Sequence, residues 1–371
     1  MRYLAAASAL AAAAAGSPAD WPARWTTFPR ATPSQGWPDG PIVGNGNQGV
    51  SVGGAPGALT LYGTIHGFWS NSLGSNSTMP PLARAPLGFP SCPGPTCNIT
   101  VGLTLLRVMI AAPQLAGAGA TWTAELDYAR AAATVVLAGA GGASLTATVY
   151  AAATAQVSIL ELRNTGSAPL AVNVTAAVND NIARVPTSAS CADATGAPAA
   201  CAAPPAVPGV ALTKDANAPA AASSFPITAA AAVLPVAATG GAAGAGALPY
   251  DVVEPKKSWA NGATVDTHTR GVTAVLNLPA GAAVTYAIAM AASEDPGVKP
   301  ATPAAVVAAR AAAVTPAALA PLRAAHEAWW VDYWARSAVA LGGEPDTEAF
   351  WYASIYALGS GTRAGQPVMC V

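Results

Sequence analysis

Apolar and polar residues alternate in short segments along most of the chain between residues 41 and 296. This alternation is typical of strands that bury one face, because successive side chains point to opposite sides of a sheet. The clearest examples are residues 145–149, 157–162, 170–178 and 272–278. Many short strands, separated by turns at a spacing of about 8–12 residues, favour an antiparallel β-sandwich. The pattern therefore predicts a mainly β fold with a large sandwich.

Turn residues separate the first predicted strands. Gly-Asn-Gly stands at residues 44–46 and Ala-Pro-Gly at residues 55–57, and both combinations supply residues suited to tight turns. The Ala/Pro-rich segment from about 186 to 208 has neither the strand nor the helix period, so we interpret it as a loop insertion. The Gly-rich segment 234–250 is interpreted as a second, flexible connection.

Beyond residue 300 the pattern becomes helical. An Ala-rich segment at 306–314 predicts one helix, and Thr315 before a proline predicts the N-cap of the next. In that second helix His326, Trp330 and Trp334 recur every four residues and therefore share one face. We expect a large partner to cover this aromatic face. We also expect His326 to be structural, bonding across the junction between the sandwich and the helical domain that follows it.

A last helix is expected to begin after Asp346 as its N-cap and to end at Gly359. Its predicted buried stripe consists of Phe350, Trp351, Ile355 and Leu358. Three carboxylates, those of Glu344, Asp346 and Glu348, cluster at its start. Negative charge is favourable at the N-terminal end of a helix, so we interpret this cluster as capping.

The charge balance excludes some partners, and the N-terminus indicates the compartment. The formal net charge of -1 favours neither nucleic acid nor an anionic membrane. Arg2 precedes an apolar run that is too short to span a bilayer, and small residues follow at 14–16. Residues 1–16 are therefore predicted to be a signal peptide. The mature chain is predicted to be secreted and to carry no membrane segment.

Cysteine usage agrees with an oxidising compartment. Cys92 and Cys97 flank one short loop, while Cys191 and Cys201 flank another, so each pair could close a small ring. The connectivity stays open, because four cysteines allow three pairings. Cys370 is left over.

Asn-X-Ser/Thr sequons stand at Asn76, Asn98 and Asn173. In a eukaryotic host they predict glycans on surface loops or strand edges. The three histidines lie far in sequence from the cysteines, so no metal site is predicted, and no motif indicates a cofactor. Nothing in the sequence indicates an oligomeric state.

Four segments carry a family resemblance. Residues 41–50 read Pro-Ile-Val-Gly-Asn-Gly-Asn-Gln-Gly-Val, Gly-Gly follows at 53–54, Leu-Thr-Leu-Tyr at 59–62, and Phe-Trp at 68–69. This order resembles the opening of the N-terminal β-sandwich domain of six-hairpin glycosidases, the α-L-fucosidase and maltose-phosphorylase type. There a proline, Gly-Asn-Gly and a valine-rich strand precede a hairpin that ends in an aromatic pair.

The other three segments follow in the family's order. Residues 122–130, Trp-Thr-Ala-Glu-Leu-Asp-Tyr-Ala-Arg, resemble its aromatic-x-x-x-Leu-Asp-Leu strand. Residues 326–337 are similar to its His-x-x-Trp-Trp-x-x-Phe-Trp-x-x-Ser linker helix. Residues 350–358, followed by Arg363-x-Gly365, look like the first helix of the catalytic barrel and the loop after it.

The resemblance implies an order of domains. Residues 17–298 would form the sandwich, 299–340 a helical linker, and 341–371 the first helix of an (α/α)6 catalytic domain. The family's catalytic carboxylates lie downstream of that first helix, so the resemblance assigns no catalytic residue here. It implies a carbohydrate partner and a chain that is inactive by itself, and it leaves hydrolysis and phosphorolysis equally open.

Several residues remain candidates for contact with sugar. His66 and Trp69 belong to a predicted loop that carries imidazole and aromatic groups, although an ordinary buried aromatic is the alternative. Arg363 follows the last helix and could lie near an active-site rim or serve the helix end. Glu125 and Asp127 alternate on a predicted strand, so they could form a catalytic pair or an exposed strand face.

Three hypotheses therefore stand. The chain is the N-terminal part of a secreted glycoside hydrolase, or a secreted sugar-binding sandwich that uses Trp69 or Trp122, or a glycosylated structural protein. The aromatic helices between residues 329 and 358 discriminate between them. A self-contained binding module would leave these faces as an exposed apolar patch, whereas a longer enzyme would cover them.

Overall fold

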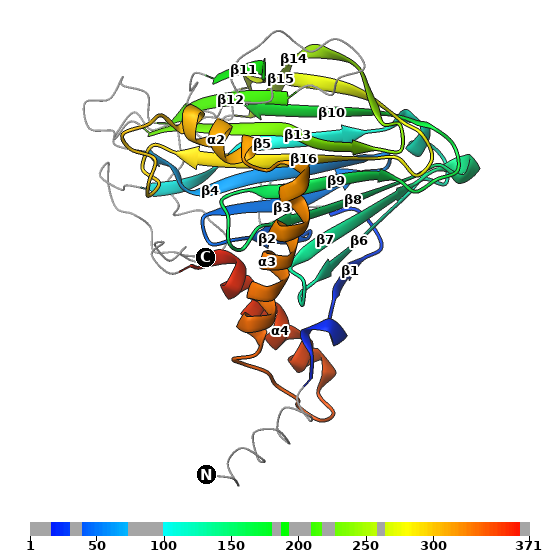
Figure 1. Ribbon diagram of the computed structural model, residues 1–371, viewed down its shortest axis with the longest axis vertical. Coiled ribbons are helices and arrows are strands. Elements are labelled where there is room, and N and C mark those ends of the chain that lie inside the picture. Colours follow the sequence, from blue (N-terminus) through cyan, green and yellow to red (C-terminus); the bar gives the residue numbers. More distant parts are fainter. Residues whose placement is uncertain are drawn as a thin grey trace.

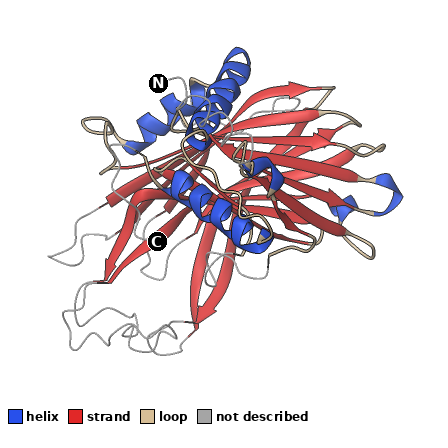
Figure 2. Cartoon of the chain, turned by 90° about the horizontal axis from the view of Figure 1, so that it is seen from below, coloured by secondary structure: helices blue, strands red, loops and turns tan. Residues whose placement is uncertain are grey.

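The protein is a two-layered β-sandwich with helices at one end and on one face (Figures 1 and 2). The computed structural model describes residues 16–29, 39–72, 99–179, 187–192, 209–216, 227–257 and 264–363. Within these ranges the chain forms two antiparallel sheets followed by three α-helices. The predicted mainly β fold with a large sandwich is confirmed.

One sheet has nine strands among the described residues. In spatial order they are β1 (Ala23–Trp25), β6 (Thr121–Asp127), β7 (Ala132–Ala138), β8 (Ser144–Ala151), β9 (Ser158–Asn164), β16 (Ala283–Ala292), β13 (Ile227–Thr239), β12 (Gly209–Ala216) and β11 (Thr187–Ala192). Short 3-10 turns at Pro18–Asp20, Pro113–Leu115 and Ala140–Gly142 lie outside the sheets.

The second sheet has seven strands among the described residues. In spatial order they are β14 (Ala243–Lys257), β15 (Thr264–Leu278), β10 (Leu170–Asn179), β5 (Ile99–Ala111), β4 (Ala58–Ser72), β3 (Gln48–Ala55) and β2 (Ile42–Gly44). The inward side chains of both sheets form one continuous apolar core. Each fully buried Val or Leu contributes about 1.5–3 kcal/mol to such a core.

Two segments interpreted as loops contain strands. Most of 234–250, expected to be a flexible connection, belongs to β13 and β14, and these strands are joined by a turn at Gly240 and Gly241. Both glycines have positive φ, 64° and 79°, as a tight hairpin requires. The segment 186–208 begins with β11, which pairs with β12, rather than with irregular chain.

The helix α2 (Pro303–Ala312) lies on the outer face of the nine-stranded sheet, over β13 and β16. Val307 and Ala311 bury themselves against the alanines of those strands. The helix α3 (Pro316–Trp334) follows with Thr315 at its N-cap and buries His326, Trp330 and Trp334, as the spacing predicted.

The helix α4 (Pro345–Gly361) departs from its prediction. It begins after Glu344 rather than Asp346, and it runs past Gly359. Its buried face consists of Glu348, Tyr352, Tyr356, Gly359 and Ser360. Phe350 and Leu358, predicted to be buried, are 73% and 55% exposed.

No single helix in the described ranges is long and apolar enough to cross a membrane, and α2 with α3 passes that test only as a pair bent by 95°.

Candidate functional site

The Gly-Asn-Gly turn between β2 and β3 is a hub where the two sheets meet. Asn45 is buried, and its amide Nδ2 donates to the carbonyl oxygens of Ala152 and Ala155 at 3.1 and 2.9 Å. Its Oδ1 accepts from the backbone N–H groups of Asn47 and Gln48 at 3.2 and 3.0 Å. One amide therefore fixes its own turn and joins it to the β8–β9 turn of the other sheet.

The buried carboxyl group of Asp295 lies beside this turn. Asp295 accepts from the backbone N–H of Ala292 at 3.0 Å and from Asn47 Nδ2 at 3.5 Å. Burial raises the pKa of Asp295, while these hydrogen bonds and the charges of Arg310 and His66 oppose the shift. The backbone N–H of His66 donates to the carbonyl of Asn47 at 2.7 Å. His66 therefore belongs to strand β4 at the hub, and not to the predicted loop.

An aromatic cluster holds α3 and α4 against this end of the sandwich. The rings of Trp330 and Tyr356 stack with centroids 5.3 Å apart. Trp334 Nε1 donates to the carbonyl of Tyr128 at 2.9 Å, and the hydroxyl of Tyr356 donates to the carbonyl of Ile42 at 2.9 Å. The aromatic faces of the two helices thus cover each other and the sandwich edge. The tryptophan faces that we expected a further partner to cover are thus covered within the described residues, so they do not discriminate a longer enzyme from a self-contained module.

His326 has the expected structural role, but it bonds α3 to two turns of the nine-stranded sheet rather than to a following domain. Its Nδ1 accepts from the backbone N–H of Ala153 at 3.2 Å, and its Nε2 lies 2.8 Å from the carbonyl oxygen of Arg130. The two contacts fit a neutral imidazole with its proton on Nε2. Burial lowers the pKa of His326, and the bond to the Arg130 carbonyl partly opposes this. The residue joins helix and sheet and has no free nitrogen for chemistry.

Arg363, just after the end of α4, packs against the Gly-Asn-Gly turn. Its guanidinium carbon lies 3.8 Å from the ring centroid of Trp329, and its Nη1 donates to the carbonyls of Gly359 and Thr362. Its side chain also packs over Gly46, where a β-carbon would collide with it. Burial lowers the pKa of Arg363 to about 10. The structure thus places Arg363 and His66 against the same turn.

The carboxylates weighed as catalytic candidates have structural partners. Glu125 pairs with Arg24 at 2.8 Å, and Asp127 pairs with Arg130 at 3.4 Å, both on the exposed surface. Glu348, interpreted as a capping charge, is buried. Its carboxylate accepts from Trp21 Nε1 at 3.1 Å and from the Leu341 N–H at 3.0 Å. Glu125 and Asp127 thus form ion pairs, and Glu348 forms hydrogen bonds that connect distant parts of the chain.

Several predicted sites stay untested. Trp69 lies in β4, where its backbone pairs with Gly102, but its side chain is not described. Asn173 is half-buried in the central strand β10, and not in a loop or at a sheet edge. Cys191 lies in β11. The remaining cysteines and sequons, at Cys92, Cys97, Cys201, Cys370, Asn76 and Asn98, lie outside the described residues.

No group of three or more His, Cys, Asp or Glu side chains that could hold a metal ion occurs in the described ranges.

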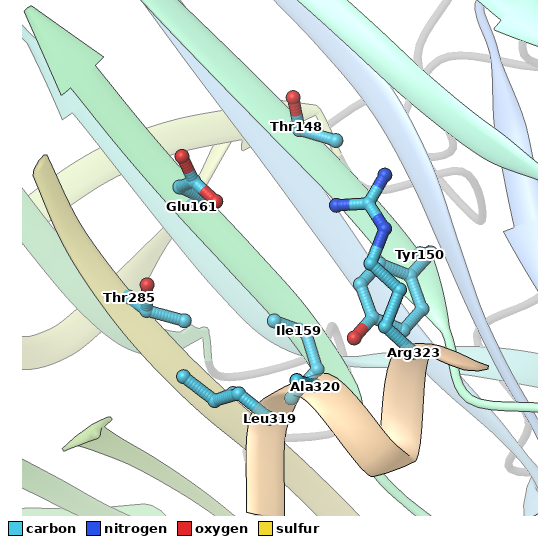
Figure 3. Close-up of a pocket in the computed structure, with 8 residues that line it drawn as sticks. All are labelled: Thr148, Tyr150, Ile159, Glu161, Thr285, Leu319, Ala320 and Arg323. Carbon is cyan, nitrogen blue, oxygen red and sulfur yellow. The ribbon is translucent and has the colours of Figure 1, made fainter. Parts of the chain in front are cut away.

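A groove that the sequence did not indicate lies between α3 and the outer face of the nine-stranded sheet (Figure 3). Its volume is about 240 Å³. It is lined by Thr148, Tyr150, Ile159, Glu161, Thr285, Leu319, Ala320 and Arg323. Glu161 was visible only as an outward residue of an alternating strand. Its neighbours come from three other elements, and no local pattern relates them.

No protein-family model matches the chain, and no curated protein matches it. Among solved structures it is similar to a putative kojibiose phosphorylase from the human microbiome, with a TM-score of 0.51 and 9% sequence identity. The similarity covers 86% of this chain and 39% of that chain. At this identity the likeness shows a shared fold, and this chain corresponds to about two-fifths of that protein.

Proposed function

We propose that this chain is the N-terminal region of a longer secreted enzyme that acts on glycosides, and that it contains no catalytic centre of its own. The observation that carries the proposal is the fold. A sandwich with helices after it matches 39% of a putative kojibiose phosphorylase. The family resemblance of residues 41–69, 122–130, 326–337 and 350–365 supports the same proposal independently.

The junction supports the non-catalytic half of the proposal. Glycoside cleavage needs a carboxylic acid near the glycosidic oxygen and a base, carboxylate or phosphate opposite it. The buried Asp295 and Glu348 accept hydrogen bonds that hold the chain together. The exposed Glu125 and Asp127 are engaged with arginines. The helices α3 and α4 are packed against the sandwich through their aromatic side chains and hydrogen bonds.

Secretion belongs to the proposal as well. Arg2, the short apolar run behind it and the small residues at 14–16 support a cleaved signal peptide. Sequencing the N-terminus of the protein exported by the native host would test this. An N-terminus near Gly16 or Ser17 is expected, and an intact Met1 on exported protein would contradict cleavage.

Activity assays test the catalytic claim. The purified 371-residue chain is expected to release no aryl alcohol from p-nitrophenyl glycosides and to form no sugar phosphate from kojibiose and inorganic phosphate. Glu125→Ala and Asp127→Ala are the matched variants. Turnover by the unaltered chain that disappears in either variant would overturn the proposal and reinstate the strand pair as catalytic.

A further inference from the structure

The groove beside α3 is built on a row of polar side chains that crosses five strands. Glu125 on β6 pairs in register with Thr134 on β7, and Thr134 pairs with Thr148 on β8. Thr148 pairs with Glu161 on β9, which pairs with Thr285 on β16. Neighbouring strands lie about 4.8 Å apart, so side chains in register form a regularly spaced line.

The helix α3 closes this line into a groove at Thr148, Glu161 and Thr285. Glu161 and Thr285 lie across the groove from Arg323 (Figure 3). Leu319 of α3 and Ile159 of β9 supply apolar surface between them. The groove therefore combines polar and aliphatic side chains, as small-molecule sites do.

The charged groups of the groove keep unused hydrogen-bonding capacity. Arg163 binds Glu161 through Nε and Nη2, both to Oε1, at 3.2 and 2.9 Å. Oε2 accepts no hydrogen bond from the described residues. Arg323 uses Nε for Glu327 at 3.1 Å and rests its guanidinium carbon 5.8 Å from the Tyr150 ring centroid. Its terminal nitrogens make no hydrogen bond to the described residues.

These groups select the chemistry of a ligand. One carboxylate and one guanidinium give the lining no net charge, so a neutral ligand is favoured over a phosphate or a carboxylate. An acceptor facing a donor, with threonine hydroxyls beside them, is complementary to adjacent hydroxyls, which donate and accept at once. The volume of about 240 Å³ lies below the roughly 300–1,000 Å³ of pockets that enclose larger molecules, which limits the ligand to about one ring.

We propose that this groove binds one pyranose unit of a neutral saccharide. Glu161 would accept from sugar hydroxyls, Arg323 would donate to them, and Leu319 would contact the C–H face of the ring. We choose a saccharide among neutral polyols because of the proposed function. The evidence for a site in the groove is independent of that function and consists of the cross-strand row and the α3 residues beside it.

Saturation-transfer NMR with the full chain, D-glucose and kojibiose as probes tests the proposal. An open groove with a few hydrogen bonds is expected to bind with a Kd on the order of millimolar. Glu161→Gln should weaken binding by about tenfold, because it removes a charged acceptor. Leu319→Trp should abolish binding by filling the groove. Inorganic phosphate should not compete.

Glu125→Gln is the matched control, because Glu125 lies in the same row, is paired with an arginine, and stands outside the groove. It should bind like the unaltered chain. If all variants bind equally, or if Glu125→Gln loses as much binding as Glu161→Gln, the groove is not the sugar site. The proposed function would remain intact in either case. Binding of neither sugar by the unaltered chain would also overturn it, whereas the proposed function is judged separately by the activity assays.

Discussion

The contact between α3 and α4 can be tested at a single glycine. Gly359 lies in the buried face of α4, and a β-carbon there would stand 2.8 Å from Tyr333 Cζ and 2.9 Å from Trp330 Cη2 and Cζ3. Favourable carbon contacts lie near 3.5–4.0 Å. Neither ring can move aside easily, because Trp330 is fully buried against Tyr356 and the Tyr333 hydroxyl is bonded to the carbonyl of Ile355.

Two opposing magnitudes decide the outcome of Gly359→Ala. Alanine is favoured over glycine in a helix by about 1 kcal/mol, whereas overpacking a rigid core costs about 1–3 kcal/mol. With two fixed rings in collision we place the cost in the upper half of that range. The free energy of unfolding should therefore fall by about 1–2 kcal/mol.

Urea unfolding followed by tryptophan fluorescence measures this change, with an unchanged slope expected. The exposed neighbour Ala357 supplies the control. Ala357→Gly should lose about 1 kcal/mol through helix propensity alone. Propensity by itself predicts opposite signs for the two variants, and the docked helix predicts the same sign. A stabilised Gly359→Ala protein would refute the packing of α4 on α3.

Two further predictions concern the junction. Asn45→Ala removes four hydrogen bonds from a buried turn, so unfolding by urea should show a loss of about 2–4 kcal/mol; a loss below about 0.5 kcal/mol, within the range of an ordinary surface change, would show that the hub is dispensable. For His326, burial lowers the folded pKa below the ordinary 6.5, so the unfolded chain binds the proton more readily and stability should fall as pH drops below about 6.5. The non-titrating His326→Gln variant should lose that part of the pH dependence, and an unaltered slope would contradict the assignment.

The sequence predicted those elements whose period was set locally. Alternation located the strands β8, β9 and β10, and four-residue spacing placed His326 and Trp330 on the buried face of α3. The hairpin of β13 and β14 was missed, because small Ala and Gly side chains carry little hydrophobic signal. Backbone hydrogen bonds and the neighbouring strands, rather than side-chain pattern, hold such a segment in a sheet.

The prediction of which face of α4 is buried was wrong for a different physical reason. The helix carries aromatic or apolar residues on every side, so periodicity cannot decide which side is buried. Tertiary partners decide it. The Tyr356 hydroxyl donates a hydrogen bond to the Ile42 carbonyl. The indole N–H of Trp21 donates to the Glu348 carboxylate, which is buried. Neither partner is near α4 in sequence, and an acidic residue near a helix start reads locally as a cap.

For the candidate sites too, local sequence predicted the turn but not the contacts that depend on distant residues. The Gly-Asn-Gly triplet predicted a turn, but its role as a hub depends on Ala152 and Ala155, more than a hundred residues away. The groove depends on the register of three strands, β8, β9 and β16, and on α3 crossing over them. Register is set by the assembled sheet, so Glu161, Thr285 and Arg323 carry no common local signal.

The proposed function makes this sandwich the front region of a longer enzyme that acts on glycosides. Sequencing the 3′ end of the mature transcript in the native host tests it most directly. If the proposal is right, the reading frame continues beyond Val371 into a domain-sized stretch of paired amphipathic helices. A stop codon directly after Val371 in the mature transcript would contradict it.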